Sequence, residues 1–74
     1  MENMQLANRI RAFRKLKGLT QHELAAETGI SLAILGTIER GNRRVTQQEL
    51  SKIAGVLAIS VEELQGQSDK DSGK

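Results

Sequence analysis

Signals that begin and end helices divide this 74-residue sequence into short pieces. Three tetrapeptides, at 20–23 (TQHE), 46–49 (TQQE) and 60–63 (SVEE), place a glutamate three residues after a threonine or serine. In such a capping box the hydroxyl oxygen accepts a backbone N–H at the start of a helix, and the glutamate accepts one from the capping residue. Glycine, which suits the left-handed conformation at a helix end, occurs where helices would stop, at Gly18, Gly29, Gly41 and Gly66. The pattern predicts several short helices separated by tight turns.

Hydrophobic spacing assigns these pieces to five helices, over about residues 4–17, 20–29, 31–40, 46–57 and 60–66. Leu6, Ile10 and Phe13 form one apolar stripe in the first helix, and the fourth helix carries a similar one. No run of alternating apolar residues is long enough for a β-strand. Because a chain of this length fills one small core, we predict a single all-α domain over residues 1–66. The tail, residues 67–74, has nothing to bury and is expected to be disordered.

Composition excludes several classes of function. Without cysteine, and with His22 as its one histidine, the chain has neither a disulfide nor a zinc ligand set. No stretch approaches the ~18 apolar residues of a membrane span, and residues 1–8 lack the apolar core of a signal peptide, so we expect a cytoplasmic protein. No catalytic partner for His22 and no glycine-rich phosphate loop is present, so we expect neither an enzyme nor a cofactor. The single aromatic residue, Phe13, argues against a stacking platform for single-stranded nucleic acid.

Charge is segregated along the chain, although the net charge is only +2. Residues 1–17 hold five basic residues against one acidic residue, and residues 39–44 hold three against one. The segments 18–38 and 45–64 are each net acidic. Ordinary solvated helix faces can give such a pattern, but basic segments that alternate with acidic ones also suit a polyanionic partner.

The second and third predicted helices meet at a short turn, Gly29-Ile30-Ser31. Two short helices joined by a three- to four-residue turn that contains glycine form the helix-turn-helix motif. Gly29 supplies the positive φ, Ile30 fills the angle between the helices, and Ser31 caps the third helix. By itself this spacing also fits any other corner between two helices.

Motifs around this turn resemble the phage repressor and Cro-like family, also called the XRE family. They are Leu19-Thr20-Gln21, Glu23-Leu24-Ala25, Gly29-Ile30-Ser31 and Ile38-Glu39-Arg40-Gly41, followed by the spacing of Leu50, Ile53, Leu57 and Ile59. The resemblance implies a lambda-repressor-like domain of five helices that binds double-stranded DNA sequence-specifically. It further implies a transcriptional regulator of the repressor type that binds a palindromic operator as a homodimer. Within the family, residues 41–46 are slightly similar to restriction–modification controllers.

The resemblance also implies which residues contact bases. On a helical wheel Ile34, Leu35 and Ile38 form the inward face of the third helix. The outward positions that meet base edges in the family are Leu32, Ala33, Gly36 and Thr37. The family commonly has polar residues there, whereas in this chain only Thr37 carries a hydroxyl. We therefore expect contacts with thymine methyl groups, or close approach of the backbone at Gly36.

Contacts to the phosphate backbone are assigned to polar and basic residues at the edges of the motif: Thr20, Gln21, Ser31, Arg40, Asn42, Arg43 and Arg44. Gln21 begins the second helix, where free N–H groups and the helix dipole favour an anion. Arg43 and Arg44 follow the third helix and suit the opposite DNA strand or a groove edge. The alternative for these two arginines is an exposed loop whose charges contact nothing.

Arg14 and Glu39 are assigned a structural role. In the family pattern an arginine of the first helix and a glutamate of the third helix pair inside the domain, and a guanidinium can bind a carboxylate through two hydrogen bonds. The homodimer surface is placed at the fifth helix and at the apolar residues Val56, Ile59 and Val61.

A second function stays open at this point. The outward Leu32 and Ala33 would also suit a surface that faces another protein. The chain would then be a protein-interaction module, or an antitoxin-like partner, that kept the fold while its recognition helix lost the residues that read bases.

Overall fold

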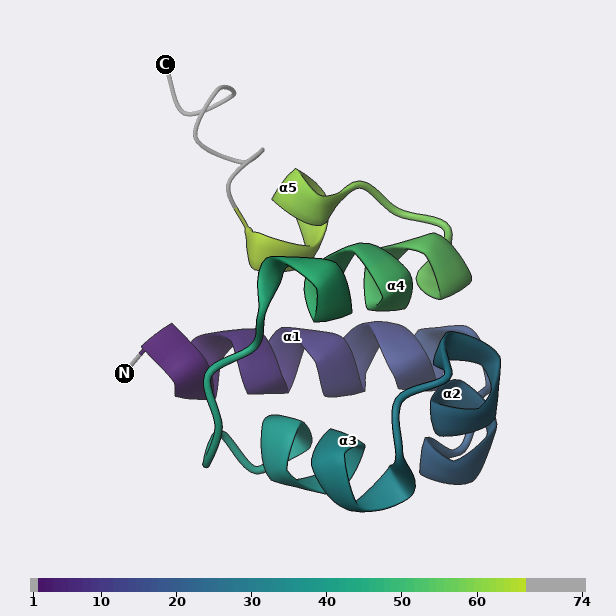
Figure 1. The fold of residues 1–74 in the computed structure, drawn as a ribbon. Helices are drawn as coiled ribbons and strands as arrows, with labels where there is room; N and C mark the ends of the chain where they lie inside the picture. Colours follow the sequence, from purple (N-terminus) through teal and green to yellow (C-terminus); the bar gives the residue numbers. More distant parts are fainter. Residues whose placement is uncertain (1, 67–74) are drawn as a thin grey trace.

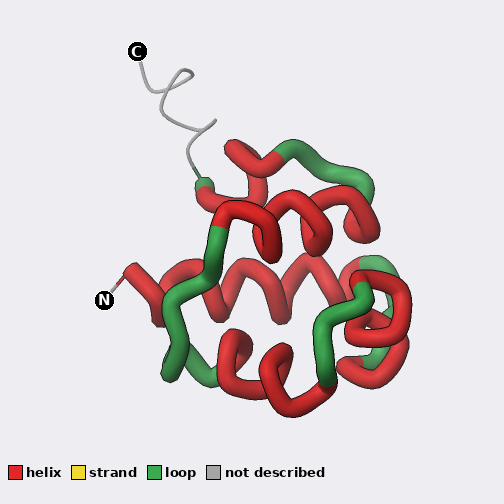
Figure 2. Tube along the Cα trace, in the orientation of Figure 1, coloured by secondary structure: helices red, strands yellow, loops and turns green. Residues whose placement is uncertain are grey.

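A computed structural model of the chain describes residues 2–66, which form five α-helices and no strand (Figures 1 and 2). The helices are α1 (Glu2–Leu16), α2 (Gln21–Thr28), α3 (Leu32–Glu39), α4 (Gln47–Leu57) and α5 (Val61–Gln65). The all-α prediction is confirmed, with boundaries within two residues of those expected. The predicted tail, residues 67–74, lies outside the described residues.

Helix α1 runs through the middle of the molecule. In Figure 1, α4 and α5 lie above it, α3 lies below it and α2 lies at its right-hand end. α1 contacts α3, α4 and α5, while α2 joins the two halves through its contacts with α3 and α4. The arrangement leaves α3 at one edge of the molecule, packed against α1 and α2.

The sequence signals for helix starts act largely as predicted. Thr20 and Thr46 each form a complete capping box, in which the hydroxyl accepts an N–H at 3.1 Å and the backbone N–H donates to the glutamate three residues later. At Ser60 the prediction of a box is only half right. The Ser60 hydroxyl accepts the Glu63 N–H at 2.9 Å, but within the described residues no return bond to the Glu63 carboxylate is formed. The side chain of Glu63 is exposed, so water solvates the carboxylate instead.

Helices α2 and α4 end in different ways. Gly29 ends α2 with a φ of 79°, in the left-handed region that glycine adopts without strain. Ala58 ends α4 with a φ of 62° although it carries a Cβ. That conformation costs a residue with a side chain about 1–2 kcal/mol. The Ala58 N–H still closes the helix by donating to the carbonyls of Ala54 and Gly55.

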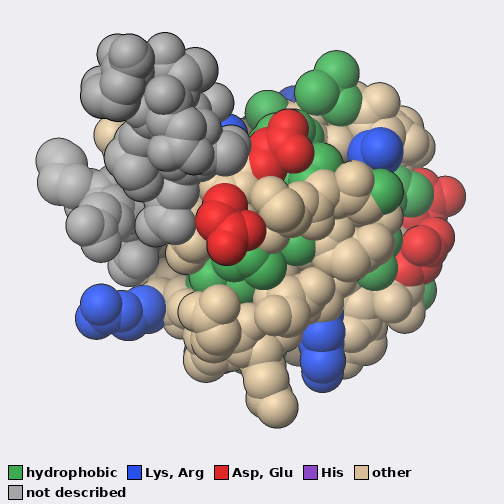
Figure 3. All heavy atoms as spheres, turned by 90° about the horizontal axis from the view of Figure 1, so that it is seen from above, with side chains coloured by type: hydrophobic (Ala, Val, Ile, Leu, Met, Phe, Trp, Pro, Cys, Tyr) green, Lys and Arg blue, Asp and Glu red, His purple; other side chains and the backbone are tan. Residues whose placement is uncertain are grey.

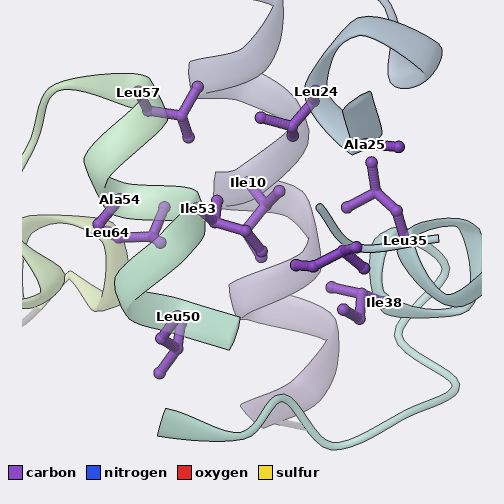
Figure 4. Close-up of a cluster of buried hydrophobic side chains, with 11 residues drawn as sticks. Ile10, Leu24, Ala25, Leu35, Ile38, Leu50, Ile53, Ala54, Leu57 and Leu64 are labelled. Carbon is purple, nitrogen blue, oxygen red and sulfur yellow. The ribbon is translucent and has the colours of Figure 1, made fainter. Parts of the chain in front are cut away.

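All five helices contribute to one hydrophobic core. The largest fully buried side chains are Ile10, Leu24, Leu35, Ile38, Ile53, Leu57 and Leu64. In Figure 4, Ile10 of α1 meets Ile53 of α4 near the centre, and Leu35 and Ile38 project from α3 toward the same centre. One face of α3 is therefore fixed by the core, which leaves the other face for a different role.

Candidate nucleic-acid interface

The turn between α2 and α3 is held by local hydrogen bonds and by one buried side chain. Ile30 is buried and joins the core, as expected of the residue that fills the angle. Its N–H donates to the Thr28 hydroxyl at 3.2 Å. Ser31 then caps α3, because its hydroxyl accepts the Ile34 N–H at 3.1 Å. These contacts fix the direction of α3 relative to α2.

A buried carboxylate joins three helices behind this turn. The Glu39 side chain of α3 is only 2% exposed. Its carboxylate accepts hydrogen bonds from Arg14 Nε at 2.8 Å, from Arg14 Nη2 at 3.1 Å and from Gln21 Nε2 at 3.1 Å. Arg14 also donates through Nη1 to the Leu19 carbonyl at 3.0 Å. Glu39 thus receives a two-pronged bond from α1 and a third bond from α2, so α3 is held against both helices.

The residues expected to contact phosphates at the starts of α2 and α3 already form hydrogen bonds within the domain through their side chains. The Gln21 carboxamide points at Glu39, as its 3.1 Å bond shows, so its side chain is only partly available to a phosphate. Its backbone N–H lies in the first turn of α2, where N–H groups have no acceptor inside the helix. Thr20 and Ser31 are exposed, and each hydroxyl oxygen already caps its own helix.

The outward face of α3 is mostly apolar. Leu32 is 36% exposed, and Ala33 is also exposed. Thr37 is half-buried, and its hydroxyl donates to the Ile34 carbonyl at 2.7 Å. In this rotamer the Thr37 oxygen can accept a further hydrogen bond, but its donor is in use.

Gly36 is buried, contrary to its expected place on the outward face. The cause is the side chain of Arg40, one turn further along the helix. A methyl group built on Gly36 would lie 3.3 Å from Nη1 and 4.0 Å from Cζ of Arg40. The Arg40 guanidinium therefore covers the backbone at Gly36, which a wheel of Cβ directions does not represent.

The basic loop after α3 contains two differently placed arginines. Arg43 donates through Nη2 to Glu49 Oε2 at 2.6 Å, and its Nε is buried with no hydrogen-bond partner among the described residues. Arg44 and Asn42 are exposed. Of the two arginines expected at the DNA backbone, Arg44 thus has its charge unengaged within the described part of the chain, and Arg43 is tied to the start of α4.

The same contacts shift the titration of Glu49. Partial burial acts to raise the pKa of Glu49, but the hydrogen bond from the Thr46 N–H and the pairing with Arg43 outweigh it. The pKa of Glu49 therefore lies below its ordinary value of 4.5. The carboxylate is charged at neutral pH and supports both the cap of α4 and the position of Arg43.

The side of the molecule away from α3 has a different character. Figure 3 views it from the side of α5, where hydrophobic side chains lie between acidic ones near the middle of the view. Among residues 2–66, no helix is both long and apolar enough to cross a membrane, and no three acidic or histidine side chains gather as a metal site.

A helix-turn-helix family model matches residues 10–64, which span α2, the turn, α3 and most of the core. The chain belongs to the XRE family of helix-turn-helix proteins. DNA binding and transcription regulation are the activities that this membership supports.

Several proteins that are similar to this XRE-family chain, one of them with a solved structure, are named as transcriptional regulators or control proteins. It is 53% identical over 64 residues to an uncharacterized HTH-type transcriptional regulator, YazB, of Bacillus subtilis, covering 86% of this chain and 93% of YazB. It is 36% identical to the control protein C.SmaI of Serratia marcescens, covering 80% and 70% of the two chains. The crystal structure of the restriction–modification controller C.AhdI from Aeromonas hydrophila superposes with a TM-score of 0.81 at 35% identity, covering 84% of this chain and 94% of that one. Transcriptional regulators of this kind are generally not enzymes.

Three contacts at the interface of this XRE-family chain are absent from the sequence expectations. They are the bonds from Gln21 to Glu39 and from Arg43 to Glu49, and the cover of Arg40 over Gly36. A weak signal existed for the last two. Arg43 lies six residues before Glu49, the glutamate of the capping box that begins α4. Gly36 and Arg40 are four residues apart, a spacing that places two residues on one face of a helix. Nothing local in the sequence marks the contact of Gln21, because its partner lies 18 residues away.

Proposed function

We propose that this XRE-family chain is a sequence-specific DNA-binding transcriptional regulator of the repressor type, whose helix α3 enters the major groove of double-stranded DNA. The observation that carries the proposal is the fixed presentation of α3. Glu39 anchors it from behind through Arg14 and Gln21, Leu35 and Ile38 bury its inner face, and its outer face is left for a ligand. The names of the relatives, which include an immunity repressor of Bacillus phage phi105, support the same activity.

Base contacts come from the outer face of α3 in this proposal. Leu32 and Ala33 suit the C5-methyl group of thymine. Thr37 offers its methyl group and the acceptor side of its hydroxyl, since its donor is bonded to Ile34. Gly36 has no side chain to contact a base, and the Arg40 guanidinium covers its backbone. The side chains of Leu32, Ala33 and Thr37 discriminate through apolar contact more than through hydrogen bonds.

Phosphate contacts come from the ends of the motif. The proposed residues are Thr20, Gln21 and Ser31 at the starts of α2 and α3, and Asn42, Arg43 and Arg44 after the end of α3. Gln21 acts here through its backbone N–H, because its carboxamide is bonded to Glu39. Arg44 supplies the least encumbered charge, whereas Arg43 reaches a phosphate only while it shares its guanidinium with Glu49.

Two copies of the chain bind one palindromic operator in this proposal. A symmetric dimer would place its two α3 helices about one DNA turn, ~34 Å, apart. Val56, Ile59 and Val61 are half-buried and lie in or beside α4 and α5, on the side of the molecule away from α3. A second copy that packs on these residues leaves both α3 helices free for DNA.

A titration of labelled duplex DNA with the full chain tests the proposal. A random-sequence duplex pool should bind at about 50 mM salt and lose most of its affinity at about 200 mM, because phosphate contacts release counterions. Selection of bound sites from the same pool should then return a palindrome with half-sites about one helical turn apart. Failure to bind any duplex at the lower salt concentration would overturn the proposal.

The second candidate function is a protein-interaction module, and the exposed Leu32 and Ala33 favour it. An apolar outer face on α3 can pack against another protein as well as against thymine methyl groups. The two functions differ in their response to charge. An interaction module would bind no duplex at low salt, and replacement of Arg44 by alanine would leave its partner binding unchanged.

A further inference from the structure

We infer that Arg40 determines specificity in this domain by reading a guanine in the major groove, in place of the phosphate contact that its position after α3 suggests. The inference rests on the proposed function, since it concerns how α3 reads the DNA that it is proposed to bind. It is carried by the place of the Arg40 side chain, by the chemistry of its neighbours and by the glycine beneath it.

The Arg40 side chain lies along the outer face of α3. Arg40 is the C-cap of the helix, and long helical side chains lean back toward the N-terminus. A methyl group built on Gly36 would stand 3.3 Å from Arg40 Nη1, so the guanidinium covers the middle of the helix. The guanidinium therefore lies over α3 and not beyond its end.

The outer face of α3 otherwise lacks a free side-chain hydrogen-bond donor. The side chains of Leu32 and Ala33 have none, and the Thr37 hydroxyl donates to the Ile34 carbonyl. Among the described residues the guanidinium of Arg40 has no hydrogen bond and no ion pair. Its N–H groups are therefore available to a base edge at the centre of an apolar surface.

Three other arginines of the chain are already committed, while Arg11 and Arg44 are exposed but lie outside α3. Arg14 binds Glu39, Arg43 binds Glu49, and Arg9 donates to backbone carbonyls of α5. Arg40 contrasts with these three, because its fork of donors is exposed next to the surface that would enter the groove. In the major groove guanine presents O6 and N7 side by side, and arginine binds this pair through two hydrogen bonds.

Gly36 has a role in this arrangement as a positioning residue. It lies inside α3 with an ordinary helical backbone, so neither a turn nor a positive φ requires glycine there. Glycine also stabilises a helix less than alanine does. The space above it is what the guanidinium of Arg40 occupies, and a Cβ at 3.3 Å would push that group outward.

Arg40→Ala and Arg40→Lys test the inference, with Arg44→Ala as a matched exposed arginine. Dissociation constants would be measured by anisotropy for three kinds of duplex: the best site selected by the wild type, the same site with each G·C pair changed in turn, and random sequence. A lost bidentate base contact should weaken the best site by roughly 5- to 150-fold. Arg40→Lys keeps the charge, so its binding to random DNA should change little. Arg44→Ala should weaken all duplexes alike.

The decisive readout is the preference at one G·C pair, which both Arg40 variants should lose. Equal losses by Arg40→Ala on selected and random DNA, or full preference in Arg40→Lys, would make Arg40 a phosphate contact and overturn the inference alone. A wild type that binds no duplex would instead overturn the proposed function, and this inference with it.

Gly36→Ala provides a variant that folds at least as well, and its melting temperature should be unchanged or higher. It should nevertheless lower discrimination at the same pair, which a purely structural role of Gly36 would not do.

Discussion

At the scale of single residues, Glu39 decides how α3 is presented. A carboxylate with a side chain only 2% exposed is tolerated when its charge and its acceptor sites are matched. Arg14 supplies the charge and two hydrogen bonds, and Gln21 supplies a third. The family pattern predicted the first partner. It could not predict the second, because the contact of Gln21 depends on the angle at which α2 crosses α3.

Glu39→Ala should therefore destabilise the domain strongly. Removal of one partner leaves Arg14 buried without its counter-charge, which typically costs about 3–5 kcal/mol. For a domain of this size we expect the melting temperature to fall by at least ~12 °C. Thermal melts followed by circular dichroism measure the change, with exposed Glu27→Ala as the control that should melt like the wild type. Equal melting temperatures for Glu39→Ala and the wild type would contradict the buried pair.

Arg43 and Arg44 are adjacent and should nevertheless behave differently. Arg44→Ala should weaken binding to every duplex and reduce the salt slope by about one, with no change in the melt, because its side chain is exposed and unpaired in the described residues. Arg43→Ala should also lower stability by about 0.5–1 kcal/mol, since it loses the ion pair with Glu49. Paired titrations and melts of the two variants separate the roles. A fall in melting temperature for Arg44→Ala alone would reverse this assignment.

At the scale of elements, the local rules predict the helices well and their mutual contacts poorly. The capping boxes at Thr20 and Thr46 form as the sequence indicates, since hydroxyl, glutamate and backbone lie within four residues of one another. Arg40 covers Gly36 because its side chain is long, whereas a helical wheel represents only the direction of each Cβ. The wheel therefore shows Gly36 as exposed, although the Arg40 guanidinium lies over it. The end of α4 had no glycine to mark it, and Ala58 takes the left-handed conformation there, with the Ile59 N–H donating to the Ala54 carbonyl at 3.1 Å.

Ala58→Gly should stabilise the domain. Glycine removes the 1–2 kcal/mol strain of a Cβ at positive φ, while its greater freedom in the unfolded chain offsets part of the gain, so we expect a net increase of about 0.5–1 kcal/mol. Gly29→Ala is the reverse test at the end of α2, where nothing lies within 4 Å of an added Cβ and strain alone acts. Urea unfolding should place the two variants on opposite sides of the wild type. A loss of stability in Ala58→Gly would show that the alanine methyl group matters more than the strain.

The start of α4 should make stability depend on pH. Because the folded-state pKa of Glu49 lies below its ordinary value of 4.5, the charged form is favoured by folding. Its contribution is complete above about pH 4.5 and is lost as the pH falls through the lower, folded-state value. Glu49→Gln should therefore be less stable than the wild type at pH 6, and the difference should shrink below pH ~4.5. Urea unfolding of both proteins across this range measures it, and a difference that does not vary with pH would exclude the linkage.

At the scale of the whole molecule, one arginine ties the first helix to the last. Arg9 donates through Nε to the Leu64 carbonyl at 2.9 Å and through Nη2 to the Glu63 carbonyl at 2.7 Å. The same guanidinium lies 5.7 Å from the ring centre of Phe13. These bonds supply donors to carbonyls at the C-terminus of α5, across 54 and 55 residues of sequence, and the Glu63 carbonyl also accepts the Gly66 N–H at 3.1 Å. Sequence spacing assigned Arg9 only to a basic segment, because such a contact exists only once the core has brought α1 and α5 together.

Arg9→Ala should loosen α5 while α2 and α3 stay in place. The five residues of α5 are held by Leu64 in the core, by Val61 packed against it and by this arginine, so loss of the two bonds should cost about 2 kcal/mol and lower the melting temperature by roughly 10 °C. Amide hydrogen exchange should accelerate first in α5, whereas amides of α3 should change only with global unfolding. Arg9→Lys is the control, since it keeps the charge but cannot bridge both carbonyls and should recover only part of the protection. Uniform acceleration along the chain would mean that α5 does not open separately, and unchanged exchange in α5 would mean that its apolar contacts with the core hold it without Arg9.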